Sequence, residues 1–290
     1  MEVHECKYYQ RLDDGSVECQ LCPHHCHIAV GKTGRCRSRH NKQGTLVSEV
    51  YARPCALAID PVEKKPLYHF HPGTKCLSLA CTGCNFRCLN CQNHDISQAK
   101  PDDVGHYMLP PEQVVKLCIE KNCPGIAYTY TEPLTYIEYV EDIARMAHEN
   151  GLWNILVTAG YVCKEPLNDL LPLIDAANID LKSFSDDIYQ RISGGHLSTV
   201  LDTILAMRDA GVWIELTNLV IPSVNDDMDM IREMCRWLVA NGLTNAPLHF
   251  SRFFPRYKMA DIPPTPLSTL KEAKQIALEA GIQHVYLGNV

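Results

Sequence analysis

The chain has 290 residues, of which 46% are hydrophobic and 21% charged, as expected of a globular protein with one large domain or a large and a small one. Its formal net charge of -7 gives no attraction to nucleic acid or to an acidic membrane, so we expect neither as a partner. There is no run of about 18 apolar residues to span a bilayer, and the polar start Met1–Cys6 lacks the apolar core of a signal peptide. The sequence therefore predicts a cytoplasmic protein.

Residues 1–74 are rich in cysteine, histidine, glycine and basic residues and show weak periodicity, which predicts a small, cysteine-rich, loop-rich module. From residue 75 to residue 290, short apolar runs alternate with amphipathic segments. The apolar runs predict strands at 76–80, 125–130, 153–158, 178–181, 213–218 and 247–250, with a last short strand at 284–287.

The amphipathic segments between these runs predict helices. Pro110 and Pro111 suit the first turn of one helix. Apolar residues recur at helical spacing in four further segments, at 137–147, 197–205, 231–238 and 267–280. Alternation of this kind predicts an α/β fold with a parallel sheet and crossover helices, and about six repeats suit a partial (β/α)6 barrel.

Fifteen cysteines are the unusual feature of the composition. A reducing cytoplasm disfavours disulfides, so closely spaced cysteines there indicate metal or cluster ligation. Cys118, Cys163 and Cys235 stand singly and are interpreted as small hydrophobic residues. Five others are left undecided, namely Cys6, Cys55, Cys76, Cys81 and Cys123.

Cys84, Cys88 and Cys91 directly follow the first predicted barrel strand, with the spacing C-x3-C-x2-C. Thiolates at close spacing hold iron–sulfur clusters. Three of them on one loop bind three irons of a 4Fe–4S cluster and leave the fourth iron open, as a catalytic metal site requires. The alternative is a zinc knuckle that includes Cys81, but zinc sites prefer two separated ligand pairs and no second pair stands at the usual distance.

This loop resembles the signature of the radical S-adenosylmethionine (SAM) superfamily. The resemblance implies that SAM binds the open iron and that an electron from the cluster cleaves it to a 5′-deoxyadenosyl radical. It also implies an electron donor such as flavodoxin or ferredoxin. One departure is Asn90, which stands where members of the superfamily usually carry an aromatic residue near the adenine.

Residues at the ends of later predicted strands resemble SAM-binding positions of the same superfamily. The sequence Tyr-Thr-Glu-Pro at 130–133 resembles a Gly-Gly-Glu-Pro motif without its glycines, which implies that Glu132 receives the SAM amino group. The alternative is a carboxylate that only begins a helix. Asp180 and Lys182 share one strand face and match an Asp-Leu-Lys sequence of pyruvate formate-lyase activating enzymes, which implies contact with SAM. The alternative is a structural ion pair.

Ligands bind at the carboxyl ends of the strands of a parallel barrel, so the other strand ends supply further candidates. Thr158 is a candidate for the ribose, and Gly160 allows the backbone to approach a ligand. Asn218, His249 and Arg252 are candidates for the SAM carboxylate or a substrate, although a lone histidine is more often structural.

The second group of cysteines lies in the N-terminal module, at Cys19, Cys22, Cys26 and Cys36, with the spacing C-x2-C-x3-C-x9-C. Four thiolates suit a structural zinc site or an auxiliary iron–sulfur cluster, and a nearby histidine is an alternative to one of them. A loop of free thiols is the other alternative. A metal is preferred because the module has little apolar material to hold it folded.

Over most of its length the chain resembles the branch called AmmeMemoRadiSam system radical SAM enzymes, which are similar to pyruvate formate-lyase activating enzymes. The matching stretches are 21–36, 68–73, 83–93, 127–130 and 252–259. The resemblance implies hydrogen abstraction from a protein substrate. Modification of a small molecule and a non-catalytic zinc-binding interaction protein remain as alternatives. Members of this branch often continue past a Gly-Asn-Val sequence, whereas this sequence ends there, which leaves a longer natural chain open.

Overall fold

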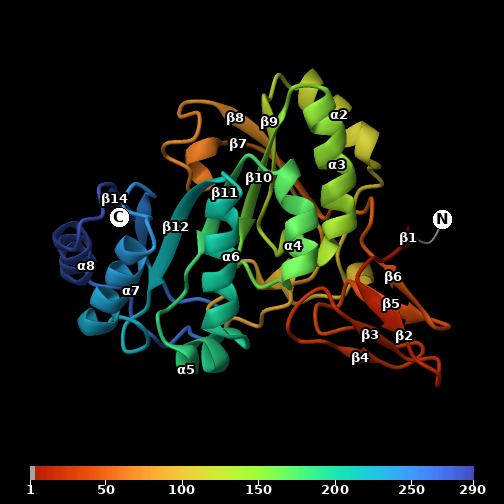
Figure 1. Ribbon diagram of the computed structural model, residues 1–290, viewed down its shortest axis with the longest axis horizontal. Helices are drawn as coiled ribbons and strands as arrows, with labels where there is room; N and C mark the ends of the chain where they lie inside the picture. Colours follow the sequence, from red (N-terminus) through yellow and green to blue (C-terminus); the bar gives the residue numbers. More distant parts are fainter. Residues whose placement is uncertain (1–3) are drawn as a thin grey trace.

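The computed structural model describes residues 4–290, and residues 1–3 of the N-terminus considered above lie outside the described part. Its centre is an eight-stranded sheet with the strand order β14-β13-β12-β11-β10-β9-β8-β7 (Figure 1). The parallel strands are β8 (Lys75–Ala80), β9 (Gly125–Tyr128), β10 (Trp153–Thr158), β11 (Ala176–Asp180), β12 (Trp213–Val220), β13 (Leu248–Arg252) and β14 (Val285–Gly288). Each predicted barrel strand is present, with its ends displaced by no more than two residues.

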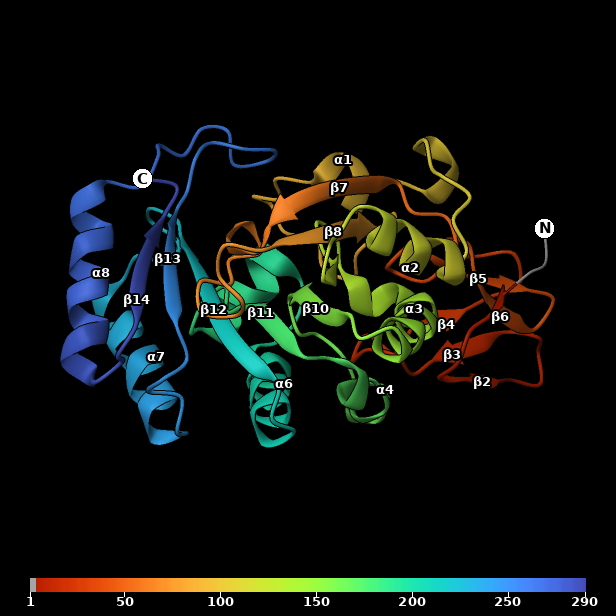
Figure 2. The same ribbon diagram turned by 90° about the horizontal axis from the view of Figure 1, so that it is seen from above.

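Crossover helices connect these strands, so that strands adjacent in the chain lie side by side in the sheet (Figure 2). The helices are α2 (Pro111–Glu120), α3 (Ile137–Glu149), α4 (Lys164–Leu170), α6 (Leu197–Asp209), α7 (Met228–Ala240) and α8 (Leu267–Ala280). Their apolar faces are buried, as Val140, Ile143 and Ala147 are in α3. The predicted α/β fold is confirmed, and β14 and β7 form the two edges of the open sheet.

Strand β7 (Ala56–Pro61) was not predicted and pairs antiparallel with β8. Its side chains are mostly half-buried, and Asp60 is the residue that points inward. The segment therefore lacks the apolar alternation that marks a strand. The large sheet thus begins before residue 75, and the division into residues 1–74 and 75–290 stays a proposal.

The N-terminal module contains two three-stranded antiparallel sheets, with the orders β1-β6-β5 and β2-β3-β4. The strands are β1 (His4–Glu5), β2 (Tyr9–Arg11), β3 (Val17–Cys19), β4 (His27–Ile28), β5 (Arg39–Lys42) and β6 (Thr45–Ser48). They are too short to show periodicity in the sequence, which predicted mainly loops. The buried guanidinium of Arg39 donates to both carboxylate oxygens of Glu138 on α3, at 2.6 and 2.8 Å, and so attaches the module to the barrel.

Between residues 4 and 290, no helix has the length and apolar character that crossing a bilayer requires.

Candidate active site

The carboxyl ends of the parallel strands surround a pocket of about 650 Å³, a volume typical of ligand and cofactor sites. Cys84, Cys88 and Cys91 line it from the loop that follows β8. Glu132, Thr158, Asp180 and Lys182 line it from the ends of β9, β10 and β11. The structure therefore brings the predicted cluster loop together with four predicted cofactor-binding residues.

The cluster loop is held by its backbone. The N–H of Arg87 donates to the carbonyl of Ser193 at 2.8 Å, and the N–H of Leu89 donates to the carbonyl of Ile192 at 3.0 Å. At the start of the loop, Gly83 has a φ of 106°, and a Cβ there would collide with the carbonyl oxygen of Cys36. Only glycine suits this position, for its conformation and for the close approach.

Two of the three sulfur atoms of the loop have hydrogen-bond partners. The N–H of Phe86 donates to Sγ of Cys84 at 3.3 Å, and Sγ of Cys91 lies 3.2 Å from the hydroxyl of Ser97. Burial raises the pKa of the Cys84 and Cys88 thiols. Ionised thiolates therefore need a positive partner in this site, such as the irons of a cluster.

Glu132 is buried and well satisfied. Its Oε1 accepts hydrogen bonds from the hydroxyl of Thr158 at 2.6 Å and the N–H of Leu134 at 3.2 Å, and its Oε2 accepts one from the N–H of Ala159 at 2.8 Å. Burial raises its pKa, against the effect of these hydrogen bonds. A carboxylate has about four acceptor positions, so one is left for a ligand in the pocket. The side chain thus begins the short helix Pro133–Tyr136 and also faces the pocket.

Asp180 and Lys182 form an ion pair at the pocket wall, with 2.8 Å between Oδ2 and Nζ. Burial acts to lower the pKa of Lys182, but the charge of Asp180, its hydrogen bond with Lys182 and the charge of Cys88 together raise that pKa. The backbone at Lys182 is fixed by Tyr189, whose hydroxyl accepts from its N–H, and by Asn225, whose amide donates to its carbonyl. The site therefore presents a fixed ammonium group beside the cluster loop.

Thr158 and Gly160, predicted at the same strand end, lie in different surroundings. The Thr158 hydroxyl lines the pocket but is already shared between Glu132 and the N–H of Gly160. A Cβ on Gly160 would meet Thr203 of α6 and Ile179 of β11 at 3.2–3.3 Å. This glycine allows close packing of strand and helix, and it is not among the residues that line the pocket.

Three further predicted residues also lie off the pocket wall. Asn218 donates its amide to the carbonyl of Leu181 at 2.7 Å. His249 is buried and its Nε2 lies 2.7 Å from Oε2 of Glu215, deeper in the barrel. Arg252 donates to a backbone carbonyl of a following loop at 2.8 Å. For these residues, the roles in cofactor binding stay predictions without support from the pocket geometry.

The pocket also contains residues that the sequence did not single out. Lys64 and Pro66 reach it from the connection between β7 and β8, and Asn289 reaches it from the end of β14. Tyr130 lines it with an unusual positive φ of 65°, and its hydroxyl bonds to Asp60. Only Tyr130 carried a signal, because it stands at a predicted strand end.

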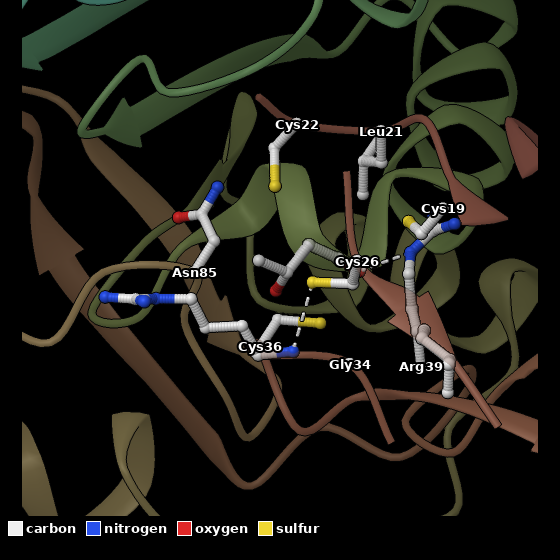
Figure 3. A pocket seen from close by; sticks show the side chains of 11 residues that line it. Cys19, Leu21, Cys22, Cys26, Gly34, Cys36, Arg39 and Asn85 are labelled. Carbon is white, nitrogen blue, oxygen red and sulfur yellow. Dashed lines mark hydrogen bonds between the residues drawn. The ribbon is translucent and has the colours of Figure 1, made fainter. Parts of the chain in front are cut away.

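The cysteines of the N-terminal module lie apart from this pocket. Cys19, Cys22, Cys26 and Cys36 line a second, small cavity (Figure 3). Across residues 4–290, no three His, Cys, Asp or Glu side chains are gathered closely enough around one point to hold a single ion as they stand. The fifteen cysteines all have free thiols.

The family model of the radical SAM superfamily matches residues 79–238, which include the cluster loop and the strands around the pocket. The chain belongs to the radical SAM superfamily. An uncharacterised protein of Methanocaldococcus jannaschii is 46% identical over 288 residues, or 99% of this chain and 86% of that protein. The pyruvate formate-lyase 1-activating enzyme of Escherichia coli K12 is 29% identical over 157 residues, which cover 51% of this chain and only 61% of the enzyme.

Among solved structures, a radical SAM methyltransferase from Sphaerobacter thermophilus has a TM-score of 0.60 at 14% identity, covering 99% of this chain and 78% of that one. This likeness shows the fold. The superfamily implies a 4Fe–4S cluster and SAM, and the residues present fit both groups. Three thiols of one loop line a pocket large enough for a cofactor, which also presents a carboxylate with a free acceptor position and an ammonium group.

Proposed function

We propose that this protein binds a 4Fe–4S cluster through Cys84, Cys88 and Cys91 and cleaves SAM reductively. The observation that carries the proposal is the shared pocket, which places the three thiols with Glu132 and the Asp180–Lys182 pair. When bound, the cluster supplies the electron that splits SAM into methionine and a 5′-deoxyadenosyl radical.

The chain's own residues bind and orient SAM in this proposal. The free acceptor position of Glu132 suits the SAM ammonium, and the Lys182 ammonium suits its carboxylate, since charge-assisted hydrogen bonds are the stronger ones. Thr158 holds the Glu132 carboxylate in place through its hydroxyl. Asp180 keeps Lys182 charged and fixes its direction.

We further propose that the hydrogen atom is taken from a protein substrate, with an electron donor such as flavodoxin or ferredoxin. The support is the similarity to pyruvate formate-lyase activating enzymes, whose name describes action on another protein. Modification of a small molecule by the same chemistry is the second candidate, because the pocket is large and lined by many polar groups.

Deuterium transfer separates these candidates. The source cells are grown in heavy water, and their extract is separated by size into a macromolecular and a small-molecule fraction. Each fraction is incubated with the reconstituted protein, SAM and dithionite, and deuterium is measured in the 5′-deoxyadenosine formed. We expect deuterium from the macromolecular fraction. Deuterium from the small-molecule fraction alone would favour the second candidate. The variant Cys88→Ala is the control and should form no 5′-deoxyadenosine.

A further inference from the structure

The four cysteines of the N-terminal module surround one cavity from three different parts of the module. Cys19 ends β3, Cys22 and Cys26 lie in the turn between β3 and β4, and Cys36 lies before β5. Figure 3 shows their side chains around the cavity, with Arg39 at one side and Asn85 at the other. Four thiols that line one enclosed space form the ligand set that zinc and iron–sulfur centres use.

Two of these sulfur atoms have a hydrogen-bond donor beside them. The N–H of Arg35 donates to Sγ of Cys26 at 3.4 Å, and the hydroxyl of Ser38 donates to Sγ of Cys36 at 3.2 Å. A neutral thiol is only a weak acceptor. The donors at Cys26 and Cys36 therefore suit thiolates, whose negative charge they stabilise.

The cavity adjoins the loop that carries the SAM cluster. The carbonyl of Cys36 packs against Gly83, directly before Cys84. Asn85, directly after Cys84, lines the cavity itself, and its backbone carbonyl lies 3.0 Å from Nε2 of His24. The Asn85 side chain is 2% exposed, and its Oδ1 has no partner among the described residues. Both neighbours of the first cluster ligand thus rest on the cysteine-lined module.

We propose that Cys19, Cys22, Cys26 and Cys36 hold a second, thiolate-bound metal centre, and that this centre fixes the segment Gly83–Asn85 and with it the first ligand of the SAM cluster. The centre is structural and separate from SAM cleavage. Zinc has to draw the four sulfurs inward, whereas an iron–sulfur cluster fills the space between them with several atoms. Both are thiolate chemistry, and their metal content distinguishes them.

The need for such a centre follows from the construction of the module. Its strands have two to four residues each, and small units of this kind seldom hold a fold through apolar burial alone. Four free thiols, three of them buried, are the competing account, because cysteine is an acceptable small hydrophobic residue. That account gives no reason for four thiols to line one cavity, two of them with hydrogen-bond donors.

Metal analysis decides between the two accounts. Iron, zinc and sulfide are measured in anaerobically purified protein and in the triple variant Cys84→Ala, Cys88→Ala, Cys91→Ala, which lacks the SAM cluster. We expect the triple variant to retain either about one zinc or about four irons with sulfide per chain. A folded triple variant without stoichiometric metal would overturn the proposal, whatever the outcome of SAM cleavage.

Ligand variants locate the retained metal. In the triple-variant background, Cys22→Ala should remove it, and Cys235→Ala, a buried single cysteine on α7, is the matched control and should keep it. If Cys22→Ala fails to fold, Cys26→His tests the same point: it keeps a metal ligand and so supports folding, but the altered ligand set should weaken retention of the metal against a chelator, and unaltered retention would contradict the assignment. Zinc bound equally well with Cys22→Ala would contradict the assignment.

Hydrogen–deuterium exchange tests the effect on the cluster loop. Extraction of the metal from the triple variant with a chelator should speed exchange at least about tenfold in a peptide that covers 83–86, where the Gly83 N–H bonds to the Ile96 carbonyl. A peptide in α8 should not change. Unchanged exchange at 83–86 would overturn the coupling.

Discussion

The carboxylate of Glu132 offers a quantitative test, because it satisfies three buried donors. In Glu132→Ala the N–H groups of Leu134 and Ala159 and the hydroxyl of Thr158 lose their acceptor. At about 1–2 kcal/mol for each, the loss would be about 3–6 kcal/mol. Burial disfavours the ionised form of Glu132, as its raised pKa indicates, and removal of this buried charge offsets part of the lost hydrogen-bond energy. We therefore expect a net destabilisation of about 2–4 kcal/mol.

The assay is anaerobic thermal unfolding of the reconstituted protein without SAM. In a chain of this size about 1 kcal/mol corresponds to about 2 °C in Tm, so Glu132→Ala should unfold about 4–8 °C lower. Glu132→Gln keeps one acceptor oxygen and should fall between this variant and the wild type. Glu233→Ala, on the exposed face of α7, is the matched control and should change Tm by less than about 1 °C.

The same variants test the role of Glu132 toward SAM. A ligand raises Tm according to its affinity for the folded state. SAM should therefore raise the Tm of the wild type and of Glu233→Ala more than that of Glu132→Gln. A Tm of Glu132→Ala within 1 °C of the wild type would refute the hydrogen-bond argument, and an undiminished SAM shift in Glu132→Gln would refute the binding role.

Three further predictions concern charged groups. Asp60→Asn leaves the Lys65 ammonium, which is 1% exposed, without its carboxylate and should lower the free energy of unfolding by about 3–5 kcal/mol, measured by thermal unfolding. Asp13→Asn, at an exposed position, is the control and should lower it by less than about 0.5 kcal/mol. Equal losses in the two variants would contradict this prediction. Burial acts to raise the pKa of Glu215, but hydrogen bonds from a histidine and two backbone N–H groups lower it below its usual value. The ionised Glu215 carboxylate therefore stabilises the fold above the unfolded pKa of about 4.3, and this stabilisation is lost as the pH falls through the folded pKa. The difference in unfolding free energy between the wild type and Glu215→Gln should accordingly narrow from about pH 6 to about pH 3. A constant difference would count against the ionised carboxylate. Lys182→Met should weaken SAM binding roughly 10–100-fold in equilibrium titration while leaving the cluster absorbance unchanged, and unaltered affinity would exclude the proposed contact.

The barrel was predictable because its strands are buried apolar runs followed by amphipathic helices. Strand β7 was not, since Asp60 is its buried residue and its pairing with β8 is a tertiary event. The short strands of the N-terminal module likewise depend on tertiary packing. Part of that packing is the buried Arg39–Glu138 ion pair, which no local sequence pattern predicts.

The site was predictable where its residues belong to a local motif or follow a strand directly, as Cys84 and Lys182 do. Asn218 does not line the pocket, because side chains alternate along a strand and its neighbour Thr217 is the one that faces it. His249 does not line the pocket either, because β13 runs two residues further than predicted and Ser251 lies at the rim in its place.

The central claim is that three thiols hold a cluster that cleaves SAM. Its most direct test is anaerobic reconstitution followed by dithionite and SAM, with 5′-deoxyadenosine measured by mass spectrometry in the wild type and in Cys84→Ala, Cys88→Ala and Cys91→Ala. We predict 5′-deoxyadenosine and methionine in equal amounts from the wild type and none from the variants. A protein that holds zinc in this loop, shows no cluster absorbance and forms no 5′-deoxyadenosine would contradict the claim.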